Sequence, residues 1–191
     1  MKVEKKILVI DNYDSFTFNL VHLLEQLDCD IVVRRNDEVD ISDIESATHV
    51  LIGPGPGLPK DSVGVQALLE KYANTKSILG VCLGMQALME YSGAEIINMD
   101  TVAHGAQEEL NPVYSGRLFN KLPDSFRVGR YHSWGFNEES IPKEYRVNAI
   151  AKDGIVMAVE HDELPLYGIQ FHPESIMTEH GLDMMRNWLN S

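Results

Sequence analysis

The chain has 191 residues, of which 44% are hydrophobic and 24% charged, and its formal net charge is −13. This length and composition predict a single globular domain spanning residues 1–191, with room for a sizeable core. The acidic excess argues against a nucleic-acid or anionic-membrane surface, because phosphates would be repelled. We therefore expect a metabolite or a protein as partner, and no nucleic acid or membrane.

The cysteines and the N-terminus bear on the cellular compartment. Cys29 and Cys82 are too few for a disulfide framework or a cysteine-based zinc site. The apolar run at residues 7–10 is too short for a signal-peptide core, and no stretch approaches the ~18 apolar residues of a membrane span. No pair of histidines has metal-ligand spacing. We expect a cytoplasmic protein without metal or cofactor.

The first half of the chain alternates short apolar runs with a helical pattern. Three runs, at residues 7–10, 31–33 and 49–52, have the continuous hydrophobicity of strands buried on both faces. Between the first two, four leucines recur at three- and four-residue spacing and predict an amphipathic helix from about Phe16. Such an alternation with right-handed crossovers gives a largely parallel sheet covered by helices.

A loop rich in proline and glycine follows the third run. Residues 53–59 read Gly-Pro-Gly-Pro-Gly-Leu-Pro, which neither a helix nor a strand can continue. Open α/β sheets bind ligands at the carboxyl ends of their strands, which favours function over a plain connecting loop. The segment is not a P-loop, because it lacks the Gly-Lys-Ser/Thr sequence.

The stretch from Ser77 to Gly93 is organised around a cysteine. Residues 78–81 predict a buried strand, and apolar residues after Cys82 recur at helical spacing. Cys82 would then lie at a strand-to-helix turn, where the positive end of the helix favours a thiolate. The N–H of Leu83 is a natural donor to an oxyanion. The alternative is a buried cysteine that acts only as a small hydrophobe.

The second half of the chain has a different pattern of apolar residues. Between about residues 94 and 171 the apolar segments are short, β-branched and separated by turn residues, as at 145–151, 155–159 and 166–171. They predict antiparallel or mixed strands, and a last helix is expected from about Glu179. The predicted fold class is α/β, an open, mostly parallel twisted sheet with helices on both faces plus a smaller antiparallel or mixed β portion.

Among the seven histidines, His172 is the best placed to activate a thiol. It follows the last predicted strand and precedes Pro173, which disfavours helical dihedrals and holds the histidine extended. Glu174 can then reach one ring nitrogen while the other faces Cys82, so a nucleophile, a base and an orienting carboxylate are all available. A structural or surface histidine is the alternative.

Two segments carry a family resemblance. Residues 80–86, GVCLGMQ, and residues 171–175, FHPES, together resemble the paired signature of the class I (triad) glutamine amidotransferases. Residues 11–20, 53–59 and 130–133 narrow the resemblance to the glutaminase subunits of anthranilate synthase and of 4-amino-4-deoxychorismate synthase. The matches follow in order along essentially the whole chain. The resemblance implies the flavodoxin-like fold of class I glutaminases.

The resemblance also implies a reaction and a partner. In such proteins the cysteine attacks the side-chain amide of L-glutamine, a thioester forms, and the released ammonia passes to a chorismate-using synthase subunit. Carried over, Cys82 is the nucleophile, His172 the general base and acid, and Glu174 the orienting carboxylate. The partner would be component I of anthranilate synthase, for tryptophan biosynthesis, or component I of aminodeoxychorismate synthase, for folate biosynthesis, or both.

Substrate contacts follow from the same resemblance. The oxyanion would be held by backbone N–H groups of Leu83 and of the Gly55 to Gly57 loop, in which Pro56 itself carries no N–H. The amino-acid end of glutamine would be held by Gln86 and by the backbone of Ser133 and Trp134.

Three positions depart from the family pattern. Met85 stands where many relatives carry histidine, Ala106 where a basic residue is common, and Trp134 where leucine is frequent. These departures predict altered packing beside the turn, an altered loop contact and an altered glutamine pocket.

Two other classes of function stay open: a regulatory docking module, against which the complete triad argues, and a thiol peptidase or γ-glutamyl hydrolase with the same chemistry.

Overall fold

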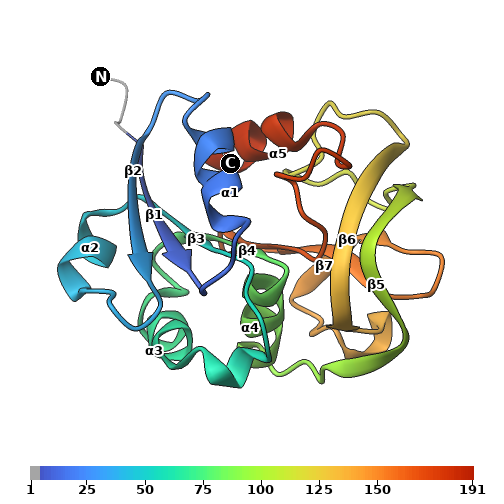
Figure 1. The fold of residues 1–191 in the computed structure, drawn as a ribbon, viewed down its shortest axis with the longest axis horizontal. Helices are drawn as coiled ribbons and strands as arrows, with labels where there is room; N and C mark the ends of the chain where they lie inside the picture. The colour runs from blue at the N-terminus through green and yellow to red at the C-terminus, as the bar shows by residue number, and fades with distance from the viewer. Residues whose placement is uncertain (1–4) are drawn as a thin grey trace.

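The centre of the molecule is a seven-stranded sheet. The computed structural model describes residues 5–191. Residues 1–4 lie outside the described residues, so the start of the segment tested above as a signal peptide is not described. The strands are β1 (Lys6–Asp11), β2 (Asp30–Arg35), β3 (His49–Ile52), β4 (Ser77–Val81), β7 (Tyr145–Ile150), β8 (Val156–His161) and β9 (Leu166–Ile169). Their order across the sheet is β2-β1-β3-β4-β9-β8-β7 (Figure 1).

The pairing of these strands confirms the predicted fold class. The pairs β2–β1, β1–β3, β3–β4 and β4–β9 are parallel, whereas β9–β8 and β8–β7 are antiparallel. The parallel part follows the flavodoxin-like order, in which ligands bind beyond the carboxyl ends of the strands. Because β9 pairs directly with β4, the segment that leads to His172 begins beside the strand that leads to Cys82.

Helices cover both faces of the sheet. Helices α1 (Thr17–Leu24) and α5 (Gly181–Leu189) lie on one face, and α3 (Val63–Tyr72) and α4 (Leu83–Tyr91) on the other (Figure 1). The short α2 (Ile41–Ser46) lies beside β2, and two 3₁₀ turns occupy Pro59–Asp61 and Glu138–Ser140. Alternate residues of β1 enter the two cores, since Ile7 and Val9 belong to one and Leu8 and Ile10 to the other.

A separate pair of strands stands at one end of the sheet. Strands β5 (Ile97–Leu110) and β6 (Phe126–Gly135) form an antiparallel ribbon (Figure 1). The expectation of only short segments here was wrong, because β5 has 14 residues. Most residues of β5 are exposed and its register with β6 is interrupted by irregularities, so no apolar run marks its length in the sequence.

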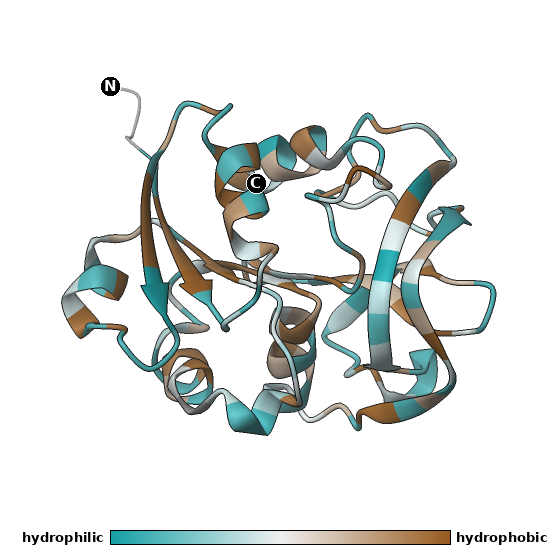
Figure 2. Cartoon of the chain, viewed as in Figure 1, coloured by the Kyte–Doolittle hydropathy of each residue, from teal (hydrophilic) through white to brown (hydrophobic). Residues whose placement is uncertain are grey.

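Hydropathy changes sharply where the parallel strands end. Strands β1 and β2 are hydrophobic along most of their length and turn hydrophilic at their carboxyl ends (Figure 2). The polar loops after these strands therefore gather at one edge of the sheet, where the predicted site residues also fall. In the described part of the chain, no helix is long and apolar enough to cross a membrane.

Candidate active site

Cys82 lies at a strained turn between β4 and α4. Its backbone has φ 54° and ψ −107°, a region that L-residues rarely occupy and that marks functional turns. The Cys82 N–H donates to the carbonyl of Ile169 at 2.8 Å, which ties the turn to β9. Two residues on, a Cβ at Gly84 would collide with the Ile52 carbonyl oxygen, so glycine lets α4 start against β3. The side chain of Cys82 is buried at the start of α4.

His172 is held in place by its backbone. It lies three residues after β9, and its N–H donates to the carbonyl of Gly129 in β6 at 3.0 Å. The Thr178 hydroxyl donates to the His172 carbonyl at 2.5 Å, and the same hydroxyl oxygen accepts from the Gly129 N–H at 2.9 Å. The central sheet and the β5–β6 ribbon therefore both position this histidine.

His172 lies between Glu174 and Cys82. Its Nδ1 is 2.6 Å from Oε1 of Glu174, whose side chain is completely buried. Its Nε2 finds no hydrogen-bond partner with good geometry among residues 5–191, yet the Cys82 sulfur is close enough to act on its proton affinity. Burial alone lowers the pKa of His172. The nearby Cys82 sulfur and the hydrogen-bonded Glu174 carboxylate outweigh burial and raise this pKa to about 10.

Two aromatic rings pack against this imidazole. The centroid of the Tyr131 ring is 5.0 Å from that of His172, and the Phe16 centroid is 5.4 Å away, both in edge-on geometry. The Tyr131 hydroxyl is 3.2 Å from the Ser175 hydroxyl. These rings shield the imidazole from water, so its interactions with the two anionic groups are stronger than they would be at the surface.

One predicted oxyanion-binding residue of the proline- and glycine-rich loop, Gly55, lies next to the turn at Cys82. A Cβ at Gly55 would lie 2.7 Å from Leu83 Cδ2 and overlap Asn12, so only glycine permits this approach. Leu83 begins α4, where the first N–H groups have no acceptor within the helix. The loop therefore borders the predicted oxyanion donor. Pro56 and Gly57 are exposed farther along the loop.

Gln86 and Trp134 are in direct contact. The Gln86 amide nitrogen donates to the Trp134 carbonyl at 3.0 Å, which joins α4 to β6. Ser133 precedes Trp134 on β6 and is half-buried. The structure thus brings the predicted substrate-binding residues of α4 and β6 to the same side of the turn.

Gln170 lies at the site but was not predicted as a site residue from the sequence. It lies just after β9, is fully buried, and its amide nitrogen is 3.6 Å from the sulfur of Cys82. The available signal was a lone polar residue in an otherwise apolar strand ending, two positions before His172.

His132 was noted only as part of the 130–133 motif. Its Nδ1 is 2.9 Å from the Trp134 carbonyl, and the Arg130 guanidinium donates to its Nε2 at 3.2 Å. Burial, aided by the positive charges of Arg130 and His172, lowers the pKa of His132 to about 4, although the hydrogen bond to Trp134 opposes this shift. His132 is therefore a neutral donor to β6 at pH 7.

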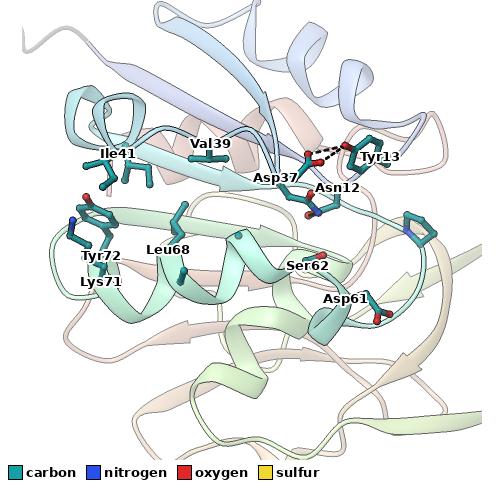
Figure 3. Close-up of a pocket in the computed structure, with 15 residues that line it drawn as sticks. Asn12, Tyr13, Asp37, Val39, Ile41, Asp61, Ser62, Leu68, Lys71 and Tyr72 are labelled. Atoms are coloured by element: carbon teal, nitrogen blue, oxygen red, sulfur yellow. Dashed lines mark hydrogen bonds between the residues drawn. The ribbon is translucent and has the colours of Figure 1, made fainter.

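A cavity lies apart from Cys82. A cavity of about 800 Å³ opens between the loops after β1 and β2 and helix α3 (Figure 3). Val39, Ile41 and Leu68 line one end, and the Tyr13 hydroxyl donates to the Asp37 carboxylate at the other (Figure 3). Within residues 5–191, no three His, Cys, Asp or Glu side chains are grouped to hold a metal ion.

Comparison with known proteins places the chain in a family. The model of the family "Glutamine amidotransferase class-I" matches residues 8–191. The chain belongs to the class I glutamine amidotransferases, as the two signature segments indicated.

Individual relatives are similar over their full length. The chain is 40% identical to anthranilate synthase component 2 of Lactococcus lactis, covering 96% of this chain and 93% of that protein. It is 40% identical to aminodeoxychorismate synthase component 2 of Serratia marcescens, covering 96% and 99%. It is 39% identical to a Bacillus subtilis protein named aminodeoxychorismate/anthranilate synthase component 2, covering 97% and 96%.

The fold also matches a solved structure. A Thermoplasma acidophilum protein described as a candidate GMP synthase subunit superposes with a TM-score of 0.89, over 100% of this chain and 94% of that one. At 24% identity this likeness concerns the fold alone.

Proposed function

We propose that the chain is the glutaminase subunit of a chorismate-using synthase and supplies it with ammonia from L-glutamine. The observation that carries the proposal is the arrangement of Cys82, His172 and Glu174 within a member of the amidotransferase family. Relatives named for anthranilate synthase and for aminodeoxychorismate synthase are both about 40% identical to the chain, and we favour anthranilate synthase component I as the partner. A role in aminodeoxychorismate synthase, or one shared by both enzymes, is the alternative.

In this proposal the reaction begins at the Cys82 sulfur. The thiolate attacks the side-chain amide carbon of glutamine, and the N–H groups of Leu83 and of the loop at Gly55 stabilise the oxyanion. His172 gives its Nε2 proton to the departing nitrogen, so ammonia leaves and a thioester remains. The same imidazole then removes a proton from water, which attacks the thioester and releases glutamate.

Glu174 and the α4–β6 contact have supporting roles. Glu174 holds the Nδ1 proton, which keeps Nε2 directed at the reacting atoms. Gln86 and the backbone of Ser133 and Trp134 hold the amino-acid end of the substrate. A cytoplasmic location is part of the proposal, because a reducing compartment keeps a cysteine nucleophile as the free thiol.

The test is to replace Cys82 by alanine in the complex with the synthase partner. Glutamine-dependent product formation should fall by at least about a thousandfold, while added ammonium salt still supports the synthase. Cys29→Ala is the matched control, because Cys29 is half-buried near the end of α1 and is expected to leave activity unchanged. Full glutamine-dependent activity in the Cys82→Ala complex would overturn the assignment.

The partner is identified by capture of the native complex. The captured synthase is supplied with chorismate and glutamine, and the product is identified by mass and fluorescence. Anthranilate supports the favoured partner, and aminodeoxychorismate supports the alternative.

A further inference from the structure

We propose that Gln170 stabilises and orients the Cys82 thiolate, as the last member of a directed chain of hydrogen bonds that starts at β6. The inference rests on the proposed role of Cys82 as nucleophile. It assigns a function to a residue outside the triad and outside the predicted substrate contacts.

The position of Gln170 requires its amide to be hydrogen-bonded. Its side chain is fully buried, and a buried amide without partners costs free energy. Its backbone N–H donates to the carbonyl of Met157 at 2.9 Å, so the main chain is fixed beside β8. The side chain is then confined between Gln86 on one side and Cys82 on the other.

The neighbouring carbonyl determines which way both amides point. The backbone oxygen of Trp134 can only accept, so the side-chain group of Gln86 that lies 3.0 Å from it must be the nitrogen. The same nitrogen is 3.2 Å from Gln170, where it must meet the oxygen. The Gln170 nitrogen is therefore the end that faces the Cys82 sulfur, at 3.6 Å.

His132 strengthens this direction from the other side of the same carbonyl. Its Nε2 accepts from Arg130, so its Nδ1 carries the proton and donates to the Trp134 oxygen. That oxygen accepts from both His132 and Gln86. Turning the side-chain amide of Gln86 or of Gln170 by 180° would therefore break at least one of these hydrogen bonds.

The chemical consequence concerns the charge on the sulfur. An N–H group aimed at sulfur favours the thiolate, because a hydrogen bond to the charged form lowers its free energy. The sulfur of a neutral thiol is only a weak acceptor for this N–H, and the Gln170 oxygen cannot accept the thiol proton readily because it is already directed at Gln86. Gln170 and His172 thus approach the sulfur from the same segment after β9, and Gln170 supplies the hydrogen bond that orients it.

The experiment measures ionisation of Cys82 directly. In a Cys29→Ser background, the rate of alkylation of Cys82 by iodoacetamide is recorded against pH in the full chain. Gln170→Met, which keeps the volume and removes the donor, should move the acid-side midpoint upward by about one pH unit. Gln66→Met on α3 is the matched control and should not move it. A folded Gln170→Met protein whose midpoint stays within about 0.3 pH unit would overturn the proposal.

A second measurement needs no variant of Gln170. The side-chain amide resonances of Gln170, recorded by ¹⁵N NMR in the Cys29→Ser protein, should titrate together with Cys82 alkylation reactivity. A Gln170 amide signal that stays constant across that transition contradicts the proposal. Both readouts use Cys82 ionisation without glutamine or a synthase, so they stand or fall separately from the proposed glutaminase activity.

Discussion

Two buried histidines at the candidate site are in opposite protonation states. The pKa of His172, after β9, is raised to about 10, and that of His132, on β6, is lowered to about 4. At pH 7 the first is an imidazolium and the second a neutral imidazole. The two are close enough for the charge of His172 to depress the pKa of His132.

The difference comes from the partners and not from burial. Burial acts on both rings in the same direction and favours the neutral form. His172 lies between the Glu174 carboxylate and the Cys82 sulfur, which both raise its pKa, whereas His132 accepts from the Arg130 guanidinium. The same kind of side chain therefore holds a transferable proton in one place and serves as a fixed hydrogen-bond donor in the other.

The largest effect is expected from removing the carboxylate that distinguishes the two histidines. Glu174→Gln removes the negative charge beside Nδ1, so the pKa of His172 should fall below 10 and kcat with glutamine should drop by about 10²–10⁴-fold. NMR titration of the imidazole and turnover of the complex measure the two effects. Glu179→Gln is the control, since Glu179 is only partly buried and its carboxylate pairs with Arg127 at the surface. A kcat within tenfold of wild type would contradict the role of Glu174.

A smaller effect is expected on the acid stability of the protein. As pH falls below 6.5, the unfolded chain takes up a proton on His132 that the folded protein refuses until about pH 4. The free energy of unfolding should therefore decrease as pH falls from about 6.5 to about 4, and His132 should account for on the order of 3 kcal/mol of this decrease. His132→Asn, which keeps a donor near Nδ1, should remove that part of the slope in urea unfolding.

Two comparisons control this measurement. His49 is also buried with a pKa lowered to about 4, so part of the acid slope should persist in the His132→Asn protein. His22→Asn, at an exposed position, serves as the matched substitution. An unchanged slope in the His132→Asn protein would show that His132 is not held neutral.

The smallest effect is expected at the aromatic ring beside His172. Tyr131→Leu removes an edge-on contact with the imidazolium, worth about 0.5–1 kcal/mol, so the pKa of His172 should fall by less than one unit. Tyr131→Phe keeps the ring, loses only the contact with Ser175, and should leave this pKa close to the wild-type value. NMR titration of both proteins separates the ring from its hydroxyl, and equal pKa values in both would exclude a contribution of the ring.

Much of the fold could be predicted because its strands are continuous apolar runs. Residues 49–52 coincide with β3, and the parallel sheet with helices on both faces is confirmed. The length of β5 could not be predicted, because a mostly exposed ribbon has no apolar pattern. The triad could be predicted as a set of residue types at strand ends, since the chemistry of a thiol nucleophile requires a base and an orienting acid.

The remaining part of the site depends on contacts between distant segments. The role of Gln170 depends on its contacts with Cys82, 88 residues earlier in the chain, and with Gln86, 84 residues earlier. His132 looks like His172 in the sequence, and only the identity of its spatial neighbours makes it neutral. The roles of the triad and substrate-binding residues stay predictions until the substitutions above are made.

The pairing of β4 with β9 has a consequence for synthesis of the protein on the ribosome. Strand β4 is made well before β9, so the Cys82 N–H meets its acceptor, the Ile169 carbonyl, only after the 87 residues from Leu83 to Ile169 have been added. His172, Glu174 and Gln170 emerge with it. Between the synthesis of Cys82 and that of Glu174, a nascent chain therefore carries this cysteine without the histidine, carboxylate and amide that lie beside it in the folded protein.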